Sequence, residues 1–436
     1  MSDPRSDLLV RYAGAFAPDV VARASGSFIE TTDGRRLLDF TAGQVCATVG
    51  HNHPRVVAAI EEACRTVLHL NSWMLSEQLL TLAERLLATV PAPLERAMFL
   101  STGGEAVEAA LRMAKLHTGN FEVVALTRGW HGMTAGASSI TLSAGRRGLG
   151  PASPGTLAIP APYGYRCPIR HCAGTCDCTC LEAGFDMVDQ MSVGSLAAVV
   201  VEPVLSAGGV IVPPAEYFAR LLDLAREREM LVIFDESQTG LGRLGTMYGF
   251  ELYDTLPDFL VLSKTLGGGV PISALVTSAE IEQSCFERNF INVTSHVSDP
   301  LPAAAANAVL DVVLDEGLVE RAGRRGDYLL AQLDQLQGRH ECVGDVRGVG
   351  LLCGIELVED RETKRPAGDL GAAFTDACQR CGLSVNAVRG RADGSANCIR
   401  MAPPLTVTED EIDRAVSIMD EALVQVTHGD LMPPRT

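Results

Sequence analysis

Lys264 is the residue in this sequence best placed for covalent chemistry. It follows Phe259 to Leu262, four apolar residues that predict a short strand buried on both faces, and a run of three glycines begins at Gly267. At the carboxyl end of such a strand, desolvation lowers the pKa of a lysine, so that its amine can attack a carbonyl and form a Schiff base. The alternative is a lysine that extends its charged head into solvent. The partners described next favour the chemical role.

Other strand ends carry groups that suit a flat aromatic cofactor. Asp235 ends an apolar strand, where its carboxylate needs a cationic partner such as a protonated pyridine nitrogen; a structural salt bridge is the alternative. Gln238 on the same turn could donate to a ring hydroxyl or be a solvated loop residue. Trp130 follows a strand and a glycine and suits stacking on a ring, although a core tryptophan would look the same. His131 could pack behind it and is given no catalytic role.

A glycine pair at the start of a helical pattern suits a phosphate group. Gly103 and Gly104 follow a predicted strand and open a strongly helical stretch. Free backbone N–H groups and the helix dipole there could cradle a phosphate. Thr102 and Glu105 also have the spacing of a capping box, so an ordinary capped helix is the alternative.

Arg400 is the candidate for binding a substrate carboxylate. It follows two apolar residues and precedes Pro403 and Pro404, which end the strand. A guanidinium fixed at that place suits bidentate binding of a carboxylate. A surface arginine is the alternative.

A dense group of thiols lies between residues 165 and 182. Its cysteines are Cys167, Cys172, Cys176, Cys178 and Cys180. Four thiolates could close a tetrahedral zinc site of a structural kind. The spacing is not that of repeated C-x-x-C pairs, and an insertion of reduced thiols is an equal alternative. The total of 13 cysteines is odd and no secretion signal is evident, so a disulfide framework is not expected.

The elements that must position these residues alternate between strands and helices from about residue 97 to 300. The expected strands are Met98–Leu100, Val123–Leu126, Ala197–Val201, Leu231–Phe234 and Phe259–Leu262. This alternation predicts an α/β fold with a mostly parallel sheet, and the polar groups after the strands, Glu202 included, would meet at one edge of it.

Three regions are expected along the 436 residues. Residues 1–50, with a hairpin at Asp33-Gly34, pack with a small domain; residues 51–310 form the large domain with the cysteine-rich insertion; residues 311–436 form a smaller α+β domain that opens with one amphipathic helix over 310–336. The net charge of −18 argues against binding to nucleic acid or an anionic membrane, because both need a basic face. No signal peptide or membrane span is evident, so a cytoplasmic protein is expected.

Four stretches together resemble the pyridoxal phosphate-dependent class III aminotransferases of fold type I. They are Ser101–Glu105, Gly129–Gly132, Asp235–Gln238 and Ser263–Gly268. The resemblance implies an aspartate aminotransferase-like fold with a seven-stranded, mostly parallel sheet. It also implies that Lys264 holds the cofactor, Asp235 binds the pyridine nitrogen and Ser295 of a neighbouring subunit helps to bind the phosphate. The expected assembly is a homodimer or a dimer of dimers with the active site at the subunit interface.

Within this family the chain resembles the 2,2-dialkylglycine decarboxylases most. The stretches are Leu38–Gln44, Thr294–Pro302 and Ile399–Val407. The resemblance implies that Gln44 orients a substrate carboxylate for cleavage, and that Arg400 lacks the glutamate switch of relatives because Ala207 stands at that position. It also implies a K⁺ or Na⁺ site, for which oxygen ligands are suitable. The implied ligands are Leu70, Ser72, Ser295, Val297 and Asp299.

The sequence is therefore compatible with three functions. The first is a decarboxylation-dependent transaminase that converts a 2,2-dialkylglycine and pyruvate into a ketone, CO2 and alanine. The second is an ordinary aminotransferase that moves an amino group from an amino acid or ω-amino compound to a 2-oxo acid. The third is a non-catalytic protein in which the cysteine cluster binds metal and mediates contacts.

Overall fold

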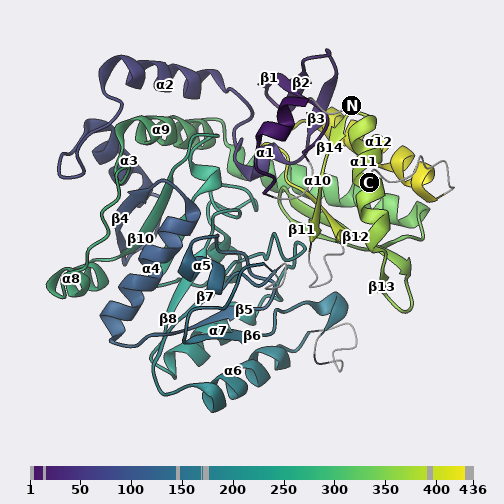
Figure 1. Ribbon diagram of the computed structural model, residues 1–436. Coiled ribbons are helices and arrows are strands. Elements are labelled where there is room, and N and C mark those ends of the chain that lie inside the picture. The colour runs from purple at the N-terminus through teal and green to yellow at the C-terminus, as the bar shows by residue number, and fades with distance from the viewer. Residues whose placement is uncertain are drawn as a thin grey trace.

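The computed structural model describes residues 4–12, 16–143, 148–167, 169, 176–389 and 396–427. Cys172, one of the predicted zinc ligands, lies outside these residues. The chain forms a large unit around one central sheet and a smaller unit that carries both the earliest strands and the last helix (Figure 1).

The central sheet has seven strands. In spatial order they are β4 (Leu94–Leu100), β10 (Ser273–Ser278), β9 (Phe259–Leu262), β8 (Leu231–Asp235), β7 (Leu196–Val201), β5 (Glu122–Leu126) and β6 (Thr156–Ile159). Strand β10 is antiparallel to both of its neighbours, and the other pairings are parallel. The predicted α/β fold with a mostly parallel, seven-stranded sheet is confirmed.

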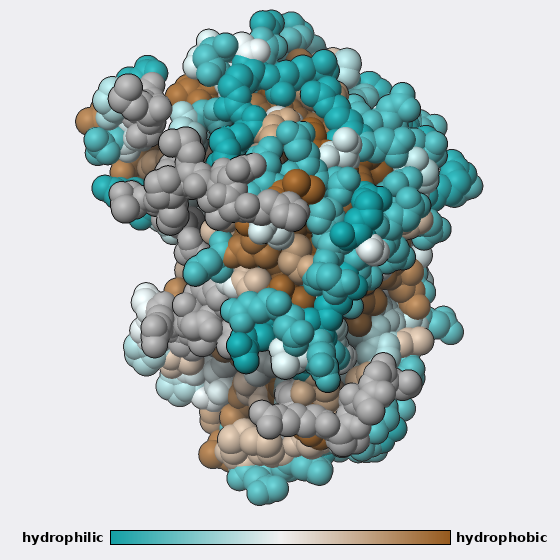
Figure 2. Space-filling view, turned by 90° about the vertical axis from the view of Figure 1, so that its right-hand side faces the viewer, coloured by the Kyte–Doolittle hydropathy of each residue, from teal (hydrophilic) through white to brown (hydrophobic). Residues whose placement is uncertain are grey.

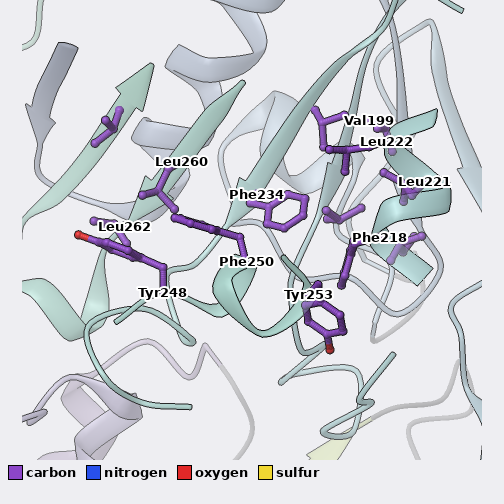
Figure 3. Packing of buried hydrophobic residues seen from close by; sticks show 14 of the residues in the cluster. Val199, Phe218, Leu221, Leu222, Phe234, Tyr248, Phe250, Tyr253, Leu260 and Leu262 are labelled. Atoms are coloured by element: carbon purple, nitrogen blue, oxygen red, sulfur yellow. The ribbon is translucent and has the colours of Figure 1, made fainter. Parts of the chain in front are cut away.

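Both faces of this sheet are buried, which explains the continuous apolar runs of its strands. In β9, Phe259 and Val261 join the cluster beneath helix α4 (Gly103–Thr118), whereas Leu260 and Leu262 point to the opposite face. There they pack near Phe250 and Tyr248, as Figure 3 shows, in the same core cluster as the buried residues of α7 (Tyr217–Arg226). Since successive side chains of a strand alternate between faces, one short strand supplies both cores.

Helices cover the two faces and one end of the large unit. They are α2 (Pro54–Thr66), α3 (Glu77–Leu87), α5 (Ala135–Ser139), α6 (Thr179–Met191), α8 (Ala279–Glu287) and α9 (Pro300–Asp315), with short 3-10 turns at Gly164–Arg166, Gly249–Tyr253 and Lys264–Leu266. Helix α9 packs on α2 and α3, away from the sheet face that α6 and α7 cover (Figure 1).

The smaller unit is built on an antiparallel sheet. Its strands are β11 (Val343–Val349), β12 (Leu352–Asp360), β16 (Ala396–Met401) and β15 (Asn386–Arg389), with β13 (Arg365–Pro366) beside β12; its helices are α10 (Leu318–Arg339), α11 (Gly368–Arg380) and α12 (Glu409–Thr427). The single helix expected over 310–336 is wrong, because α9 ends at Asp315 and α10 begins at Leu318. Gly317 lies between them with a φ of 58°, a left-handed conformation that interrupts a right-handed helix.

The beginning of the chain joins the smaller unit. After a 3-10 turn (Pro4–Leu8), strands β1 (Val21–Ser25), β2 (Phe28–Thr31) and β3 (Arg36–Asp39) form an antiparallel meander, and β3 pairs in parallel with β14 (Leu383–Ser384). The hairpin at Asp33-Gly34 is confirmed by the pairing of β2 with β3. The exact domain boundaries stay a prediction.

Figure 2 views the side that carries the smaller unit. Its surface is mainly hydrophilic, with hydrophobic residues gathered near the middle of the view. Within the described ranges, the helices are too short or too polar to cross a bilayer.

Candidate functional site

One cavity of about 310 Å³ collects most of the residues expected to do chemistry. Its lining includes Thr102, Gly103, Gly104, Trp130, His131, Asp235 and Lys264, together with Cys46 and Ser237. Apart from Cys46, these residues lie at or after the ends of β4, β5, β8 and β9, so the predicted meeting of strand ends at one edge of the sheet is what the structure shows.

Asp235 is held in its charged form inside this cavity wall. The residue is 4% exposed, and its carboxylate accepts hydrogen bonds from His131 Nδ1 at 2.9 Å and from the backbone N–H of Ser237 at 3.1 Å. Burial acts to raise the pKa of Asp235, but the hydrogen bond and charge of His131 outweigh it, so the pKa is lowered. His131 therefore positions the carboxylate, a role that the sequence did not suggest.

Lys264 opens the 3-10 turn directly after β9. Burial lowers the pKa of its amine, with the nearby Arg400 acting in the same direction and Asp235 opposing it. Cys46 lines the same cavity, and burial raises the pKa of its thiol, while Lys264 acts to lower it. The predicted depression of the lysine pKa is thus present, and Cys46 is a neighbour that the site prediction missed.

The amino terminus of α4 faces the cavity with unused donors. Thr102 and Glu105 form the expected capping box, in which the Glu105 N–H donates to Thr102 Oγ1 and the Thr102 N–H donates to the Glu105 carboxylate. Among the described residues, the N–H groups of Gly103 and Gly104 have no hydrogen-bond acceptor. A Cβ on Gly103 would lie 3.1 Å from Ser237 Oγ, so the cradle is tight against its neighbours.

Arg400 on β16 reaches the large unit from the smaller one. Its Nη1 donates to Gln238 Oε1 at 2.8 Å and to Ser206 Oγ at 3.0 Å, and the residue is 6% exposed. Both contacts are neutral oxygens, and within the described chain no carboxylate lies within ion-pair distance of this guanidinium. Burial lowers the pKa of Arg400, which is the direction expected for a charge without a close counter-ion.

Glu202 supports the cavity from behind. Its carboxylate accepts the backbone N–H of Trp130 at 2.8 Å and that of Ser206 at 3.3 Å. Burial raises the pKa of Glu202 to about 7. The cavity lining does not include Glu202, Gln238 or Arg400. Glu202 instead holds Trp130, which does line the cavity, and Arg400 donates to Gln238.

The segment before Cys46 has an unusual backbone. Residues 42–45 form one turn, α1 (Ala42–Val45), in which Ala42, Gly43, Gln44 and Val45 all have positive φ angles of 43°, 52°, 72° and 66°. The turn is held by Asp39, whose buried carboxylate accepts hydrogen bonds from Thr41, Gly43 and His51. Gln44 is exposed and does not line the cavity, whereas Cys46 does.

The residues implied for the alkali-ion site lie in two neighbouring segments. Leu70, Ser72 and Val297 are partly buried, and Ser295 is exposed and does not line the cavity of its own chain. The two carboxylate oxygens of Asp299 each accept a hydrogen bond from a histidine instead: from His69 and from His296, both at 2.6 Å. The alkali-ion site stays a prediction.

Four of the five clustered cysteines can be placed. Cys178 and Cys180 are buried, while Cys167 and Cys176 are partly exposed. Burial raises the pKa of Cys178 to about 12, helped by the neighbouring Cys176. In the part of the chain that the structure describes, these thiols do not form a group of three convergent ligands. A zinc site here stays a prediction.

Many enzymes have a lysine, a buried carboxylate and a glycine-lined helix terminus around one cavity. The comparison with known families shows which kind of enzyme this is. The family model for class III aminotransferases matches residues 13–423. The chain belongs to this family. Class III aminotransferases are pyridoxal phosphate-dependent enzymes of fold type I, and this one has the matching sheet. The non-catalytic alternative is not supported.

Several relatives of this aminotransferase are similar over nearly their whole length. An uncharacterised aminotransferase of Schizosaccharomyces pombe is 45% identical over 416 residues, which cover 95% of this chain and 92% of the relative. A probable 4-aminobutyrate aminotransferase of Bacillus subtilis is 31% identical, with 93% and 92% covered. The crystal structure of a Bacillus anthracis aminotransferase has a TM-score of 0.90 at 28% identity and covers 97% of both chains. These similarities support the family and do not single out 2,2-dialkylglycine decarboxylases.

The donors at this aminotransferase's cavity fit the family's cofactor. Free N–H groups at the start of α4 match a phosphate, and a buried, ionised Asp235 matches a pyridinium nitrogen. Lys264 and Trp130 line the same cavity.

Proposed function

We propose that this aminotransferase moves an amino group from an α-amino acid to a 2-oxo acid without decarboxylation. The observation that carries the proposal is the buried guanidinium of Arg400, which is held by Gln238 and Ser206 and forms no ion pair with a carboxylate among the described residues. A buried charge without a counter-ion is costly, so a substrate that brings a carboxylate gains the full benefit of the pair. Ala207, next to Ser206, cannot supply that negative charge itself.

The roles of the residues follow from their positions. When bound, pyridoxal phosphate supplies a carbonyl for the donor amine and a ring that withdraws electrons from the donor's Cα. Asp235, kept ionised by His131, would hold the ring proton. The amine of Lys264, with its lowered pKa, would remove the proton from Cα and return it to the cofactor side. Gly103 and Gly104 would bind the phosphate and Trp130 would cover the ring.

The decarboxylating function receives less support from the site. Its predicted discriminating residue, Gln44, is exposed and does not line the cavity of this chain. The thiol of Cys46 occupies the wall near Lys264 instead. A proton-removing half-reaction needs only Lys264 at Cα, and we propose this ordinary transamination as the main activity.

The test compares donors with and without a carboxylate. In the wild-type holoenzyme with pyruvate or another 2-oxo acid as acceptor, α-amino acids should be used and simple alkylamines should be poor donors. Arg400→Gln should lower kcat/KM for the amino acid by roughly 100-fold, because it removes one partner of a buried charge pair. The same change should leave the alkylamine rate unchanged or higher. Equal losses for both donor classes would contradict the role of Arg400.

A second assay separates transamination from decarboxylation. The enzyme is given 2-aminoisobutyrate and pyruvate, and CO2, acetone and alanine are measured. We expect little product compared with the transamination of an amino acid that carries a Cα hydrogen. Release of CO2 at a comparable rate would establish the decarboxylating function in place of the one proposed.

A further inference from the structure

We infer that His69, His296 and Asp299 form a binding site for a divalent transition-metal ion such as Zn²⁺. The three residues come from two segments far apart in sequence: His69 follows α2, and the other two immediately precede α9. Among the residues that the structure describes, this is the group of His, Cys, Asp and Glu ligands that converges, with one donor atom from each within 4.8 Å of the others.

The geometry brings both imidazoles onto one carboxylate. His69 Nδ1 lies 2.6 Å from Asp299 Oδ1, and His296 Nδ1 lies 2.6 Å from Asp299 Oδ2. The two rings are neighbours, with centroids 5.3 Å apart. Ligands about 2.1 Å from a tetrahedral zinc ion stand roughly 3.4 Å from one another. To admit an ion, each imidazole would move about 1 Å away from its carboxylate oxygen, and the three donor atoms, which already lie within 4.8 Å of one another, would settle at this spacing.

In the single chain the two imidazoles are more exposed than the carboxylate, which leaves room for that adjustment. The side chains of His69 and His296 are 51% and 66% exposed, whereas that of Asp299 is only 9% exposed. The largely buried carboxylate would anchor the site, and the more exposed imidazoles would close over it. Coordination positions that protein atoms leave open would be filled by water, as in zinc sites with three protein ligands.

The donor set selects the class of metal. Two imidazole nitrogens with one carboxylate suit first-row transition metals, whereas alkali and alkaline-earth ions prefer oxygen ligands alone. The net charge of the set, one negative charge with two neutral rings, complements a dication. The transition-metal site uses different ligands from the K⁺ or Na⁺ site that family resemblance implies, although both would include Asp299.

A histidine paired with a carboxylate is by itself an ordinary contact in this molecule. His340 Nε2 lies 2.5 Å from Asp420 Oδ1, and His51 Nε2 lies 2.8 Å from Asp39 Oδ2. Among the residues that the structure describes, neither pair has a second imidazole in reach as a third ligand. The two-histidine arrangement at Asp299 is what distinguishes it, and the His340 pair provides a matched control.

An ion at this place would connect the segment after α2 to a segment that lines a cavity next to the cofactor cavity. His296 and Asp299 also line a second cavity of about 250 Å³, which shares Ser101 and Ile272 with the first. Occupancy of the site would hold the segment after α2 against the segment that carries Ser295.

The experiment uses holoenzyme that has been treated with a chelator and then titrated with Zn²⁺ by calorimetry. We expect one ion per chain in a saturable isotherm. His69→Ala and His296→Ala should each weaken the affinity for Zn²⁺ by at least about 10-fold, because each removes a ligand. His340→Ala should leave it unchanged. Retention of bound pyridoxal phosphate shows that each variant is folded.

The cysteine cluster could bind Zn²⁺ too, and two further experiments distinguish binding there from binding at the histidine site. A Cys176→Ser/Cys178→Ser variant should keep the isotherm if the histidine site is responsible. A Co²⁺ titration of the wild type needs no variant: the histidine site predicts visible d–d bands without thiolate charge-transfer absorption. Zinc binding that disappears with the cysteines, survives loss of both histidines, or is not saturable would overturn the proposal.

Discussion

Replacing Asp39 by asparagine should open the left-handed turn that places Cys46 in the cofactor cavity. A left-handed conformation costs an L-residue about 1–2 kcal/mol, so Ala42, Gln44 and Val45 together store about 3–6 kcal/mol. Asp39, which is 2% exposed, opposes this strain by accepting four hydrogen bonds. The turn therefore depends on the carboxylate.

The loss of stability expected for Asp39→Asn follows from those four hydrogen bonds. They come from the Thr41 N–H at 2.9 Å, Thr41 Oγ1 at 2.6 Å, the Gly43 N–H at 3.0 Å and His51 Nε2 at 2.8 Å. An asparagine amide keeps one acceptor oxygen and turns an NH2 group toward the remaining donors, so about two bonds are lost. At about 1.5–3 kcal/mol for each hydrogen bond to a charged group, losing two bonds costs about 3–6 kcal/mol of stability, which is similar to the strain in the turn.

The primary assay is the alkylation rate of Cys46 in the holoenzyme, followed by mass spectrometry of the peptide that contains it. Asp39→Asn should increase this rate by about 10-fold or more and lower Tm by several degrees, since relaxation of the turn releases strain that offsets part of the about 3–6 kcal/mol lost with the two hydrogen bonds. Asp33→Asn is the matched control, because this exposed residue in the preceding hairpin accepts a hydrogen bond from Thr31. If Asp39→Asn labels at the control's rate and has the control's Tm, the carboxylate does not hold the turn.

Two further changes test the support of the cavity. Glu202 has its pKa raised to about 7 by burial, so the folded protein binds a proton that the unfolded chain releases near pH 4.5; its contribution therefore falls as pH rises from about 5 through 7. Glu202→Gln should gain stability relative to wild type by roughly 1.4 kcal/mol per pH unit across that window, measured by denaturation at pH 5, 6, 7 and 8, and parallel pH profiles would contradict the raised pKa. Asp235→Asn should retain the fold yet weaken pyridoxal phosphate binding and lower kcat by roughly 100-fold or more, because it removes the ionised partner that His131 orients; full activity with normal cofactor retention would exclude that role.

The strand ends were predictable because burial on both faces produces unbroken apolar runs. Phe259 to Leu262 and Leu231 to Phe234 can be recognised for that reason, and whatever follows them must lie at one edge of the sheet. The capping box at Thr102 was equally visible, since its residues are three apart in sequence.

The missed features depend on contacts between distant segments. His131, which follows β5, binds Asp235 at the end of β8. Ser206 of the large unit contacts Arg400 of the smaller unit. The turn at residues 42–45 could be recognised only as a loop, because three non-glycine residues adopt positive φ when tertiary hydrogen bonds compensate for the strain. Gly317 looked compatible with a continuing amphipathic pattern, but its left-handed backbone separates α9 from α10.

The parallel pairing of β3 with β14 has a consequence for how the chain folds during synthesis. Leu37 and Leu38 are fully buried, yet β3 must wait for Leu383 and Ser384 to leave the ribosome before its outer edge is paired. At about 5–20 residues per second, that interval lasts on the order of tens of seconds. Nascent chains therefore carry an unpaired apolar strand through most of translation, and truncated products that lack the last 60 or so residues will present that edge to chaperones and to one another.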